Sequence, residues 1–523
     1  MTDHEPPRVV ETHASVLVFY DDVVLKYKKP LRLPFVDFTS IEQRRRACDA
    51  EVASNRRLSP DVYLGVADVK MAAVLLDHAV VMRRLPEGRS LASMAASGDP
   101  ALAGQLPRLA RLLAMFHAGA ERSEEIDAGA RPSAIARTWR RCFDALTPFT
   151  AALGDTPSLE HVDGLATRYL RGRGPLFEER IAGGRVCDGH GDLLANDVFL
   201  LDDGPRVLDC IDFDDELRHI DVVADIAFLA MDLEHLGAPA VAREFVRSYR
   251  EAAGDRFPVT LLHHYCAQRA VIRSEVACLR STQRSAAGDQ SSVAGGDRAQ
   301  ARSLLSLAHD HLEAGRVILG VVAGLPGTGK STLARAVGER LGWPVLRSDD
   351  IRREIMGVRD DAQPLTASFE AGAYAPAATA RTYRTMLERA GELIVRGQPV
   401  VLDATFNDPA FRRAVEELAD TTTSDLVVLR CTVPPRVAEA RVRARRQRGG
   451  DVSGADEGVV RAMAATAVPW SRAVTVDTEH GTDDDHVASA VRALRACLSP
   501  PTTGGGTHRS LGTLASTDSA RLG

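Results

Sequence analysis

The sequence is poor in lysine and asparagine. Of its 65 basic residues only five are lysine, and asparagine occurs three times in 523 residues. Because arginine is the default cation, a retained lysine marks a position where a compact ammonium group on a flexible stem is needed. Rare residues also fall at random, so they count only where they lie inside independent motifs. The lysines are Lys26, Lys28, Lys29, Lys70 and Lys330, and the asparagines are Asn55, Asn196 and Asn407.

Other absences narrow the class of protein. No apolar run approaches the ~20 residues that span a bilayer, and the start MTDHEPPRVVETH lacks the basic and apolar regions of a secretory signal. The eight cysteines form no CxxC pair and no zinc-spaced cluster with histidine, which favours reduced, buried thiols. A net charge of -6 gives no general attraction to nucleic acid or to an anionic membrane. These features predict a cytoplasmic protein without membrane partners.

The length of 523 residues exceeds what one hydrophobic core organises, so at least two domains are expected. Residues 281–300 are rich in Ser, Gly and Gln and predict a linker between domains at 13–280 and 301–498. Residues 1–12 predict a flexible N-terminus. Residues 499–523 have too few apolar side chains to order themselves and predict a disordered tail.

The two predicted domains differ in pattern. Before the linker, two β-branched runs flank Asp21 and Asp22 as in a hairpin, and helical periodicity dominates from residue 101 to about 280. This predicts a bilobed α+β domain. After the linker, strands alternate with helices, which predicts a parallel sheet with helices on both faces and makes the whole chain an α/β multidomain protein.

The segment GLPGTGKS follows an apolar strand and precedes a helix, the context that a phosphate-binding loop requires. Glycines let the backbone N–H groups surround phosphate oxygens, and the helix N-terminus adds its positive dipole. Lys330 is expected to reach the β and γ phosphates of ATP, and the Ser331 hydroxyl to bind Mg²⁺. The predicted nucleotide-binding residues are Gly324, Leu325, Pro326, Gly327, Thr328, Gly329, Lys330, Ser331 and Thr332.

Further candidates lie at the ends of later strands in this domain. Asp403 ends the strand PVVLD, where a carboxylate would hold the magnesium ion through water. Asn407 follows, as a substrate contact or as a turn residue. Ser348, Asp349 and Arg352 follow another strand, and Asp349 could accept the proton of an acceptor hydroxyl. Capping of the next helix by Ser348 or Asp349 is the compatible alternative.

An arginine-rich segment, RVAEARVRARRQR, predicts a helix that could close over the phosphates. Arg441 and Arg445 are the predicted nucleotide contacts within it. A solvated basic face or a patch for nucleic acid is the alternative interpretation. The arginines of the segment are Arg436, Arg441, Arg443, Arg445, Arg446 and Arg448.

The first domain carries HGDLLAND at residues 190–197 and IDFDD at residues 211–215. Phosphoryl transfer needs one carboxylate facing the acceptor hydroxyl and oxygen ligands holding magnesium, roles that Asp192 and Asp212 can fill. Upstream, Lys26 in VVLK is preferred over Lys28 as the ATP-contacting lysine, and Glu51 is its predicted partner.

Two pairs of residues have less specific predictions. Asp221 and Asp225 are expected to anchor the HGD loop by hydrogen bonds. Arg269 and Arg273 share a helix face, where they could meet an anionic acceptor or form a surface salt bridge.

These motifs carry two resemblances. Residues 317–498 resemble the P-loop small-molecule kinases, a group that includes gluconate-kinase-like and zeta-toxin-like proteins and is often labelled AAA-family ATPase. Residues 13–280 resemble the aminoglycoside-phosphotransferase branch of the protein-kinase-like fold, because Lys, Glu, HGD and IDF occur in that order. In the latter, Asp197 stands where the resemblance places a metal-binding asparagine, and Asn196 is one place earlier, so both are candidate metal ligands. Together they resemble bacterial two-domain proteins that combine these halves.

The resemblance implies an ATP- and Mg²⁺-dependent phosphotransferase that acts on a small-molecule hydroxyl. In this interpretation the first domain phosphorylates or senses a second ligand. The alternative makes the first domain a non-catalytic ligand sensor that regulates a C-terminal ATPase. Nucleic acid is not an expected partner, and the sequence predicts neither the acceptor nor the oligomeric state.

Overall fold

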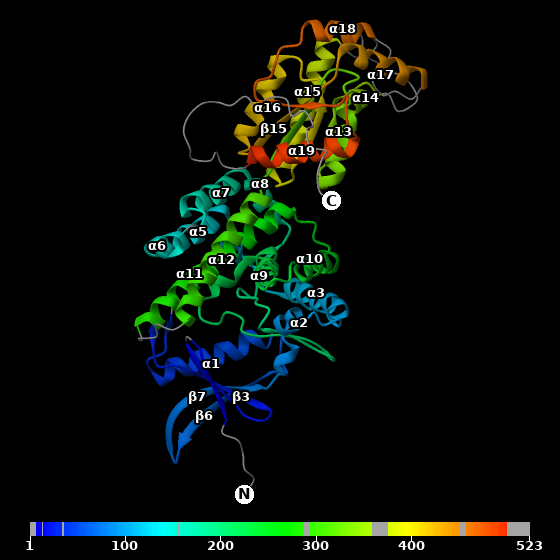
Figure 1. Ribbon diagram of the computed structural model, residues 1–523. Helices are drawn as coiled ribbons and strands as arrows, with labels where there is room; N and C mark the ends of the chain where they lie inside the picture. The colour runs from blue at the N-terminus through cyan, green and yellow to red at the C-terminus, as the bar shows by residue number, and fades with distance from the viewer. Residues whose placement is uncertain are drawn as a thin grey trace, which may run out of the picture. The chain divides into compact units, whose positions relative to one another are not determined.

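The computed structural model describes residues 7–12, 14–33, 36–154, 156–286, 292–357, 375–448 and 457–498. The chain folds into two compact units (Figure 1). The first comprises residues 1–170 and 174–315, and the second residues 171–173 and 316–523. Among the helices of the described ranges, none is long and apolar enough to cross a membrane.

The first unit opens with a five-stranded antiparallel sheet in the order β1-β2-β3-β7-β6. Asp21 and Asp22 turn the chain between β2 and β3, so the predicted hairpin is confirmed. Helix α1 starts at a capping box made by Ser40 and Gln43, and it packs its buried Cys48 and Val52 against the sheet. The strands are β1 Arg8–Glu11, β2 Ser15–Phe19, β3 Val23–Lys28, β6 Tyr63–Met71 and β7 Val74–Arg83, with α1 at Ile41–Asn55 and a short pair, β4 Arg32–Leu33 and β5 Val36–Asp37.

The predicted flexible N-terminus differs from the structure where it is described. Residues Arg8–Glu11 form β1 and pair with β2, because two adjacent β-branched valines suit an extended edge strand. Residues 1–6 lie outside the described part of the chain, as does the predicted tail at 499–523.

A helical lobe completes the first unit. Helix α9 lies at its centre, since eleven of its fourteen residues are buried. Two short antiparallel pairs, the hairpin β9-β10 and the pair β8-β11, flank the HGD and IDF segments. The helices are α2 Leu91–Ser97, α3 Leu102–Gly119, α4 Glu124–Gly129, α5 Pro132–Leu146, α6 Thr150–Leu153, α7 Leu159–Gly172, α8 Gly174–Ala182, α9 Val222–His235, α10 Pro239–Ala253, α11 Val259–Ala286 and α12 Ser292–Ala314; the strands are β8 Val186–Asp188, β9 Val198–Leu201, β10 Gly204–Val207 and β11 His219–Asp221; and short 3-10 turns lie at Glu87–Arg89, Thr147–Phe149 and Asp215–Arg218.

The boundary between the units differs from the predicted linker at 281–300. Helix α11 continues to Ala286, and α12 packs along it and belongs to the first unit, which ends at Gly315. The apolar side chains that hold α12 there begin at Ala301, beyond the Ser- and Gly-rich stretch that predicted the linker. Ser274 and Arg280 of α11 add hydrogen bonds to the Ala301 carbonyl and the Gln300 side chain.

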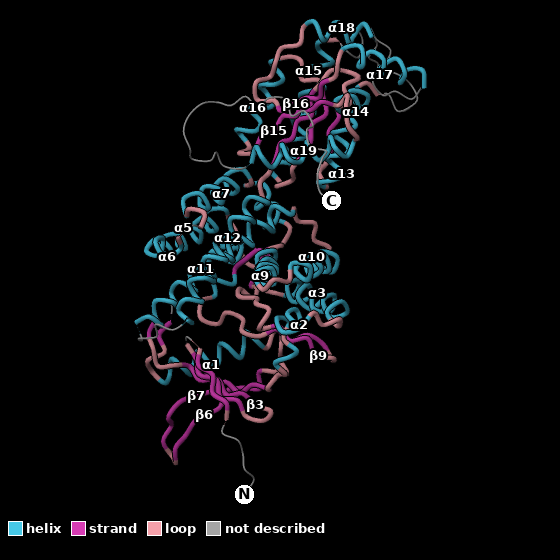
Figure 2. Tube along the Cα trace, in the orientation of Figure 1, coloured by secondary structure: helices cyan, strands magenta, loops and turns pink. Residues whose placement is uncertain are grey.

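The second unit is a five-stranded parallel sheet in the order β13-β14-β12-β15-β16 with helices on both faces (Figure 2), so the predicted fold class is confirmed. Every residue of β12 and of β14 is buried, as expected for central strands covered on both sides. The strands are β12 Ile318–Ala323, β13 Val345–Arg347, β14 Val400–Ala404, β15 Asp425–Thr432 and β16 Val474–Asp477, and the helices are α13 Lys330–Leu341, α14 Ser348–Ile355, α15 Pro376–Val395, α16 Pro409–Thr421, α17 Pro435–Arg448, α18 Glu457–Ala465 and α19 Asp483–Leu498.

Candidate active sites

The GLPGTGKS loop joins the central strand β12 to α13. Gly324, Gly327 and Gly329 adopt φ of 152°, 83° and 82°, the region where glycine alone is unstrained. A Cβ atom on Gly327 would lie 2.4 Å from the carbonyl oxygen of Ala438 in α17. A side chain at Gly324 or Gly327 would clash with neighbouring atoms, and at Gly329 the positive φ disfavours one. The loop backbone can therefore surround a phosphate group closely.

Hydrogen bonds fix the shape of this loop. The Thr328 hydroxyl donates to the carbonyl of Leu325 at 2.8 Å, across Pro326, so these residues shape the loop. The Thr478 hydroxyl, just after β16, donates to the carbonyl of Thr328 at 2.6 Å. Sequence reasoning missed Thr478, because it lies 150 residues from its partner and the strand VTVD before it is short.

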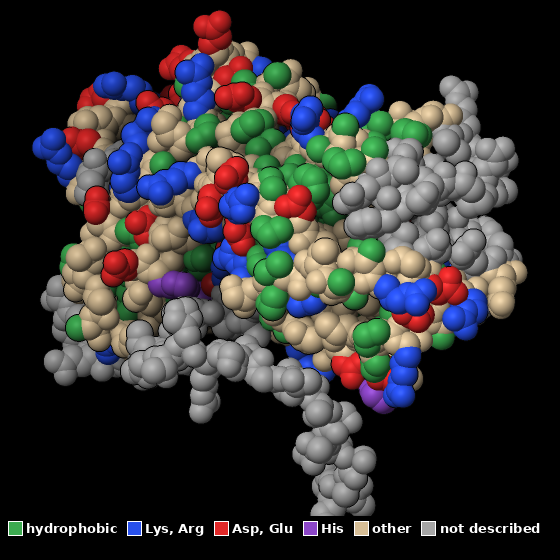
Figure 3. Space-filling model, turned by 90° about the horizontal axis from the view of Figure 1, so that it is seen from above, with side chains coloured by type: hydrophobic (Ala, Val, Ile, Leu, Met, Phe, Trp, Pro, Cys, Tyr) green, Lys and Arg blue, Asp and Glu red, His purple; other side chains and the backbone are tan. Residues whose placement is uncertain are grey.

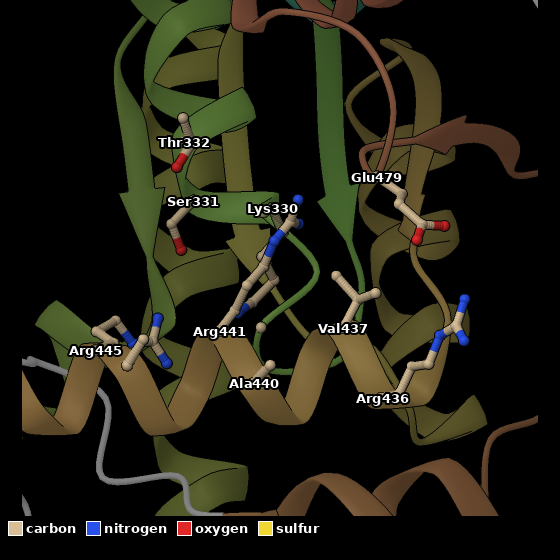
Figure 4. Close-up of a pocket in the computed structure, with 12 residues that line it drawn as sticks. Lys330, Ser331, Thr332, Arg436, Val437, Ala440, Arg441, Arg445 and Glu479 are labelled. Carbon is tan, nitrogen blue, oxygen red and sulfur yellow. The ribbon is translucent and has the colours of Figure 1, made fainter.

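A pocket of about 830 Å³ opens in front of the loop. Figure 4 shows Arg441 extending from α17 toward Lys330. Arg441 also donates from Nη2 to the carbonyl of Thr478 at 2.8 Å. The polar residues lining the pocket are Lys330, Ser331, Thr332, Arg436, Arg441, Arg445 and Glu479.

The arginines of α17 divide into two groups. Arg441 and Arg445 line the pocket from one face of the helix, four residues apart, and Arg436 lines it from the first turn. Arg443 forms an ion pair with Glu457 at 2.9 Å instead. The side chains of Arg446 and Arg448 lie outside the described part. Glu479 is a pocket residue that the sequence reasoning did not assign to the nucleotide, and Arg436 was named only as part of the arginine-rich segment.

Asp403 lies on β14, in register with Val322 near the end of β12. Its side chain is 3% exposed. Oδ2 lies 3.2 Å from Nε of Arg347, whereas Oδ1 is buried and has no hydrogen-bond partner among the described residues. An unsatisfied buried carboxylate oxygen beside the phosphate loop fits a site for a hydrated Mg²⁺.

Asp349 and Arg352 lie on α14, directly after β13, with 2.7 Å between a carboxylate oxygen and Nη1. The N-cap of α14 is Arg347 and no side chain caps it, so capping by Ser348 or Asp349 is not what the structure shows. Tyr383 faces the same region: its hydroxyl lies 3.1 Å from that of Thr405, and burial raises its pKa despite that hydrogen bond. Residues 358–374, which follow α14, lie outside the described part.

Asn407 has a structural position. Its side-chain amide donates to the hydroxyl of Thr466, just after α18, at 3.2 Å and lies 3.4 Å from the carbonyl of Met463 in α18. It therefore ties the loop after β14 to α18.

In the first unit, Glu51 of α1 contacts both lysines of β3. Its two carboxylate oxygens lie 2.7 Å from Nζ of Lys26 and 2.8 Å from Nζ of Lys28. Lys26 also pairs with Asp209 at 2.7 Å, and Lys28 with Asp212 at 3.0 Å. Burial opposes the charge on Lys26, but Asp209 and Glu51 outweigh it and hold the pKa of Lys26 well above its ordinary value. The preferred lysine therefore shares Glu51 with its neighbour.

Asp225 of α9 fixes the HGD loop. Its carboxylate accepts the backbone N–H groups of His190 and Gly191 at 2.7 and 2.8 Å, and it lies 3.2 Å from Nε2 of His117. Burial opposes ionisation of Asp225, but these hydrogen bonds hold its pKa below the ordinary value. Asp221 instead caps α9 and pairs with the buried Arg180 at 2.6 Å.

Carboxylates gather around the HGD and IDF segments. Burial raises the pKa of Asp192, with Arg273 opposing from 3.9 Å. Burial, then Asp209 and Asp192, raise the pKa of Asp197. Asn196 is exposed and forms none of the hydrogen bonds found in the described residues, so Asp197 is the better placed of the two candidate ligands.

Two residues near this site differ from expectation. The sequence analysis did not name Asp209, although LDCIDF contains this aspartate three residues before Asp212. The φ of Asp209 is 62°, which is unusual for a residue with a side chain. Arg269 is 7% exposed, and its guanidinium carbon lies 5.1 Å from the centroid of the Phe228 ring. The expectation that Arg269 forms a surface salt bridge is therefore wrong.

A family model and several solved structures match parts of the chain. Residues 319–469 match a family model described as an AAA domain. A gluconokinase structure from Sinorhizobium meliloti is 21% identical with a TM-score of 0.24, covering 35% of this chain and 91% of its own. A choline/ethanolamine kinase family structure from Mesorhizobium loti is 13% identical with a TM-score of 0.36, covering 60% of this chain and 93% of its own.

Full-length relatives occur in mycobacteria. The uncharacterized protein Rv2004c of Mycobacterium tuberculosis and the uncharacterized protein Mb2027c of Mycobacterium bovis are each 36% identical over 502 residues. Each match covers 95% of this chain and 97% of the relative. The chain belongs to the same family as these mycobacterial proteins.

Proposed function

We propose that the second unit transfers the γ-phosphate of ATP to a hydroxyl group of a small molecule. The observation that carries this proposal is the pocket in which the glycine loop and three arginines of α17 face one another. Four cationic side chains around one open pocket suit the three phosphates of a nucleotide. A general ATPase would not need Asp349 and Arg352 beyond the end of the neighbouring strand, where an acceptor binds in open α/β sheets.

Each residue has a role in this proposal. Lys330 and the backbone of the glycine loop bind the β and γ phosphates, and Arg441 and Arg445 bind them from α17. Ser331 and Asp403 would hold Mg²⁺, which supplies positive charge against the phosphate oxygens when it is bound. The charge on the transferred group is thus neutralised from two sides.

Asp349 acts as the general base. It takes the proton of the acceptor hydroxyl while that oxygen forms a bond to the γ-phosphorus, and the bond from the γ-phosphorus to the β-phosphate oxygen breaks to leave ADP. The contact with Arg352 orients the Asp349 carboxylate.

We further propose that the first unit binds a second ATP and phosphorylates or senses another ligand. Lys26, held by Glu51, would contact the phosphates, Asp192 would accept the acceptor proton, and Asp212 with Asp197 would hold Mg²⁺. The support is that Lys26, Glu51 and Asp212 form one connected set of ion pairs. The partner is a small molecule in the cytoplasm in both cases.

A specific observation favours a second candidate function, in which the first unit is a non-catalytic sensor. A carboxylate oxygen of Asp209 lies 2.7 Å from Nζ of Lys26. Asn196 is exposed to solvent and forms no hydrogen bond with the carboxylates of the described residues. An ion pair that already satisfies the lysine competes with a nucleotide phosphate. ATP and Mg²⁺ titrated into the full-length K330A variant separate the two candidates, because a sensor would show no remaining nucleotide binding.

Binding of nucleic acid by α17 finds less support. Three of its arginines face the pocket, Arg443 is paired, and the face of the molecule in Figure 3 mixes basic with acidic side chains. A binding curve whose affinity falls steeply with salt would instead favour nucleic acid.

The test of the main proposal measures ADP release in the presence of candidate acceptors: sugars, nucleosides and aminoglycosides. The wild type is compared with K330A, D192A and the double variant. K330A is expected to remove transfer by the second unit and D192A any transfer by the first. The proposal fails if the double variant keeps both ATP hydrolysis and transfer.

A further inference from the structure

Two histidines and a glutamate meet in the first unit, away from the kinase-like site. His161 lies in the first turn of α7, and His309 and Glu313 lie one helical turn apart near the end of α12. Their potential ligand atoms all lie within 4.8 Å of one another. Residues almost 150 positions apart in the sequence thus converge, which explains why cysteine and histidine spacing alone does not predict the cluster.

The contacts within this cluster are not ordinary hydrogen bonds. Nε2 of His161 lies 3.6 Å from Oε1 of Glu313, too far for a hydrogen bond. This nitrogen is shielded from solvent and makes no hydrogen bond among the described residues. The rings of His161 and His309 are 5.3 Å apart between centroids. The fold therefore holds three good ligands together without satisfying His161.

The spacing fits a transition-metal ion. Zinc at ~2.0–2.1 Å from tetrahedral nitrogen and oxygen ligands places those ligand atoms about 3.3–3.4 Å apart, close to the 3.6 Å between His161 and Glu313. The ligand atom of His309 lies within 4.8 Å of the other two, so metal binding requires this side chain to move closer. Two imidazoles and a carboxylate suit Zn²⁺ better than Mg²⁺, which prefers oxygen ligands.

The surroundings support such a site. A carboxylate oxygen of Asp310 lies 3.5 Å from Nδ1 of His309, so Nε2 is the ring nitrogen that remains for the metal. The side chains of His161, His309 and Glu313 are 33%, 22% and 21% exposed, so an ion can enter from solvent.

We propose that His161, His309 and Glu313 bind one Zn²⁺ ion, with water completing its coordination. The ion joins the start of α7 to the end of α12 and so stabilises the helical lobe. This site is independent of phosphoryl transfer in either unit.

The test uses the untagged full-length protein, freed of metal with a chelator and titrated with Co²⁺ as a spectroscopic probe for zinc sites. One equivalent should bind and produce the visible absorption of four- or five-coordinate cobalt without a thiolate charge-transfer band. H161A and E313Q should each weaken binding at least about 10-fold. Zn²⁺ should displace the cobalt and raise the melting temperature of the wild type but not of H161A or E313Q.

Matched variants keep the result decisive. E160Q removes a neighbouring exposed carboxylate of α7, and H480A removes a histidine from the exposed Asp477, Glu479 and His480 group in the second unit. Both should bind Co²⁺ like the wild type. If H161A proves unstable, the nearly isosteric E313Q carries the comparison. The proposal is overturned if the wild type binds no Co²⁺, if H161A and E313Q bind it unchanged, or if H480A alone removes it.

Discussion

At the scale of single residues, the arginines of α17 allow a matched comparison. R441A or R445A should raise the KM for ATP roughly 10- to 100-fold, because each change removes a charged hydrogen-bond donor of ~1.5–3 kcal/mol from the phosphate pocket. R443A, on the same helix but paired with Glu457, should leave the KM within about 2-fold. Steady-state kinetics of ADP release measures both. Equal effects of R441A and R443A would contradict the proposed phosphate contacts.

His264 supplies a prediction about pH. It is buried between Tyr169, whose ring lies 4.6 Å away, and Trp139, whose indole Nε1 lies 3.3 Å from its Nε2. Burial lowers the pKa of His264 to about 3, from an ordinary value near 6.5. Below about pH 6.5 the unfolded state binds a proton that the folded state excludes. Stability should therefore fall as the pH drops toward 3, by about 1.4 kcal/mol per pH unit from this residue.

The H264F variant tests this sign. It should be less stable at pH 7.5 by roughly 1–3 kcal/mol, because Trp139 loses its acceptor, but it should lose less stability than the wild type between pH 6.5 and pH 4.5. Urea unfolding followed by Trp139 fluorescence, with W343F and W470F in both proteins, isolates the first unit. H480F, a change at an exposed histidine, should keep the wild-type slope. An unchanged slope in H264F would exclude His264 as a source of acid sensitivity.

Individual residues also show how far sequence reasoning reaches. Lys26, Lys330 and Asp403 lie where the motifs place them, because each is fixed by local spacing in or next to a strand. Glu51 lies on α1 and pairs with Lys26 as predicted. The contacts of Asp209 and Thr478 could not be predicted, because their partners Lys26 and Thr328 lie far away in the sequence. Their positions depend on tertiary packing.

At the scale of elements, the phosphate loop is packed against α17. G327A should weaken ATP binding at least about 10-fold, because its Cβ would lie 2.4 Å from the Ala438 carbonyl and a φ of 83° strains alanine. G342A is the matched control: it has a φ of 69° but nothing within 4 Å of the new Cβ. It should cost about 1–2 kcal/mol of stability by strain and leave the affinity unchanged. Nucleotide titration and thermal unfolding together distinguish contact from strain, and a loss of affinity in both variants would refute the packing argument.

The elements themselves were largely predictable. Alternating strands and helices indicated the parallel sheet, and Asp21 and Asp22 indicated the first hairpin, since both patterns are local. The short strand β16 was not, because it is only four residues long. The helix before β12 was predictable, but its packing on the first unit was not. In α12, apolar residues beyond Ala301 decide the packing, whereas the polar residues before it suggested a linker.

At the scale of the whole molecule, two nucleotide sites predict a binding stoichiometry. The full-length protein should bind two ATP per chain with Mg²⁺, K330A should bind one, and K330A combined with K26A should bind none. K70A, a change at a half-exposed lysine of β6, is the control and should bind two. Equilibrium dialysis or calorimetry counts the sites. One ATP in the wild type and none in K330A would support the sensor.

The place where α12 ends has a practical consequence for separating the two halves. A chain cut near residue 286 would lose α12 and leave the matching face of α11 bare, and the released half would carry the apolar side chains of Ala301, Leu304, Leu305 and Ala308 without a cover. Both fragments should then aggregate. A cut after Gly315 keeps that face closed, so each half has the better prospect of remaining soluble when it is produced alone.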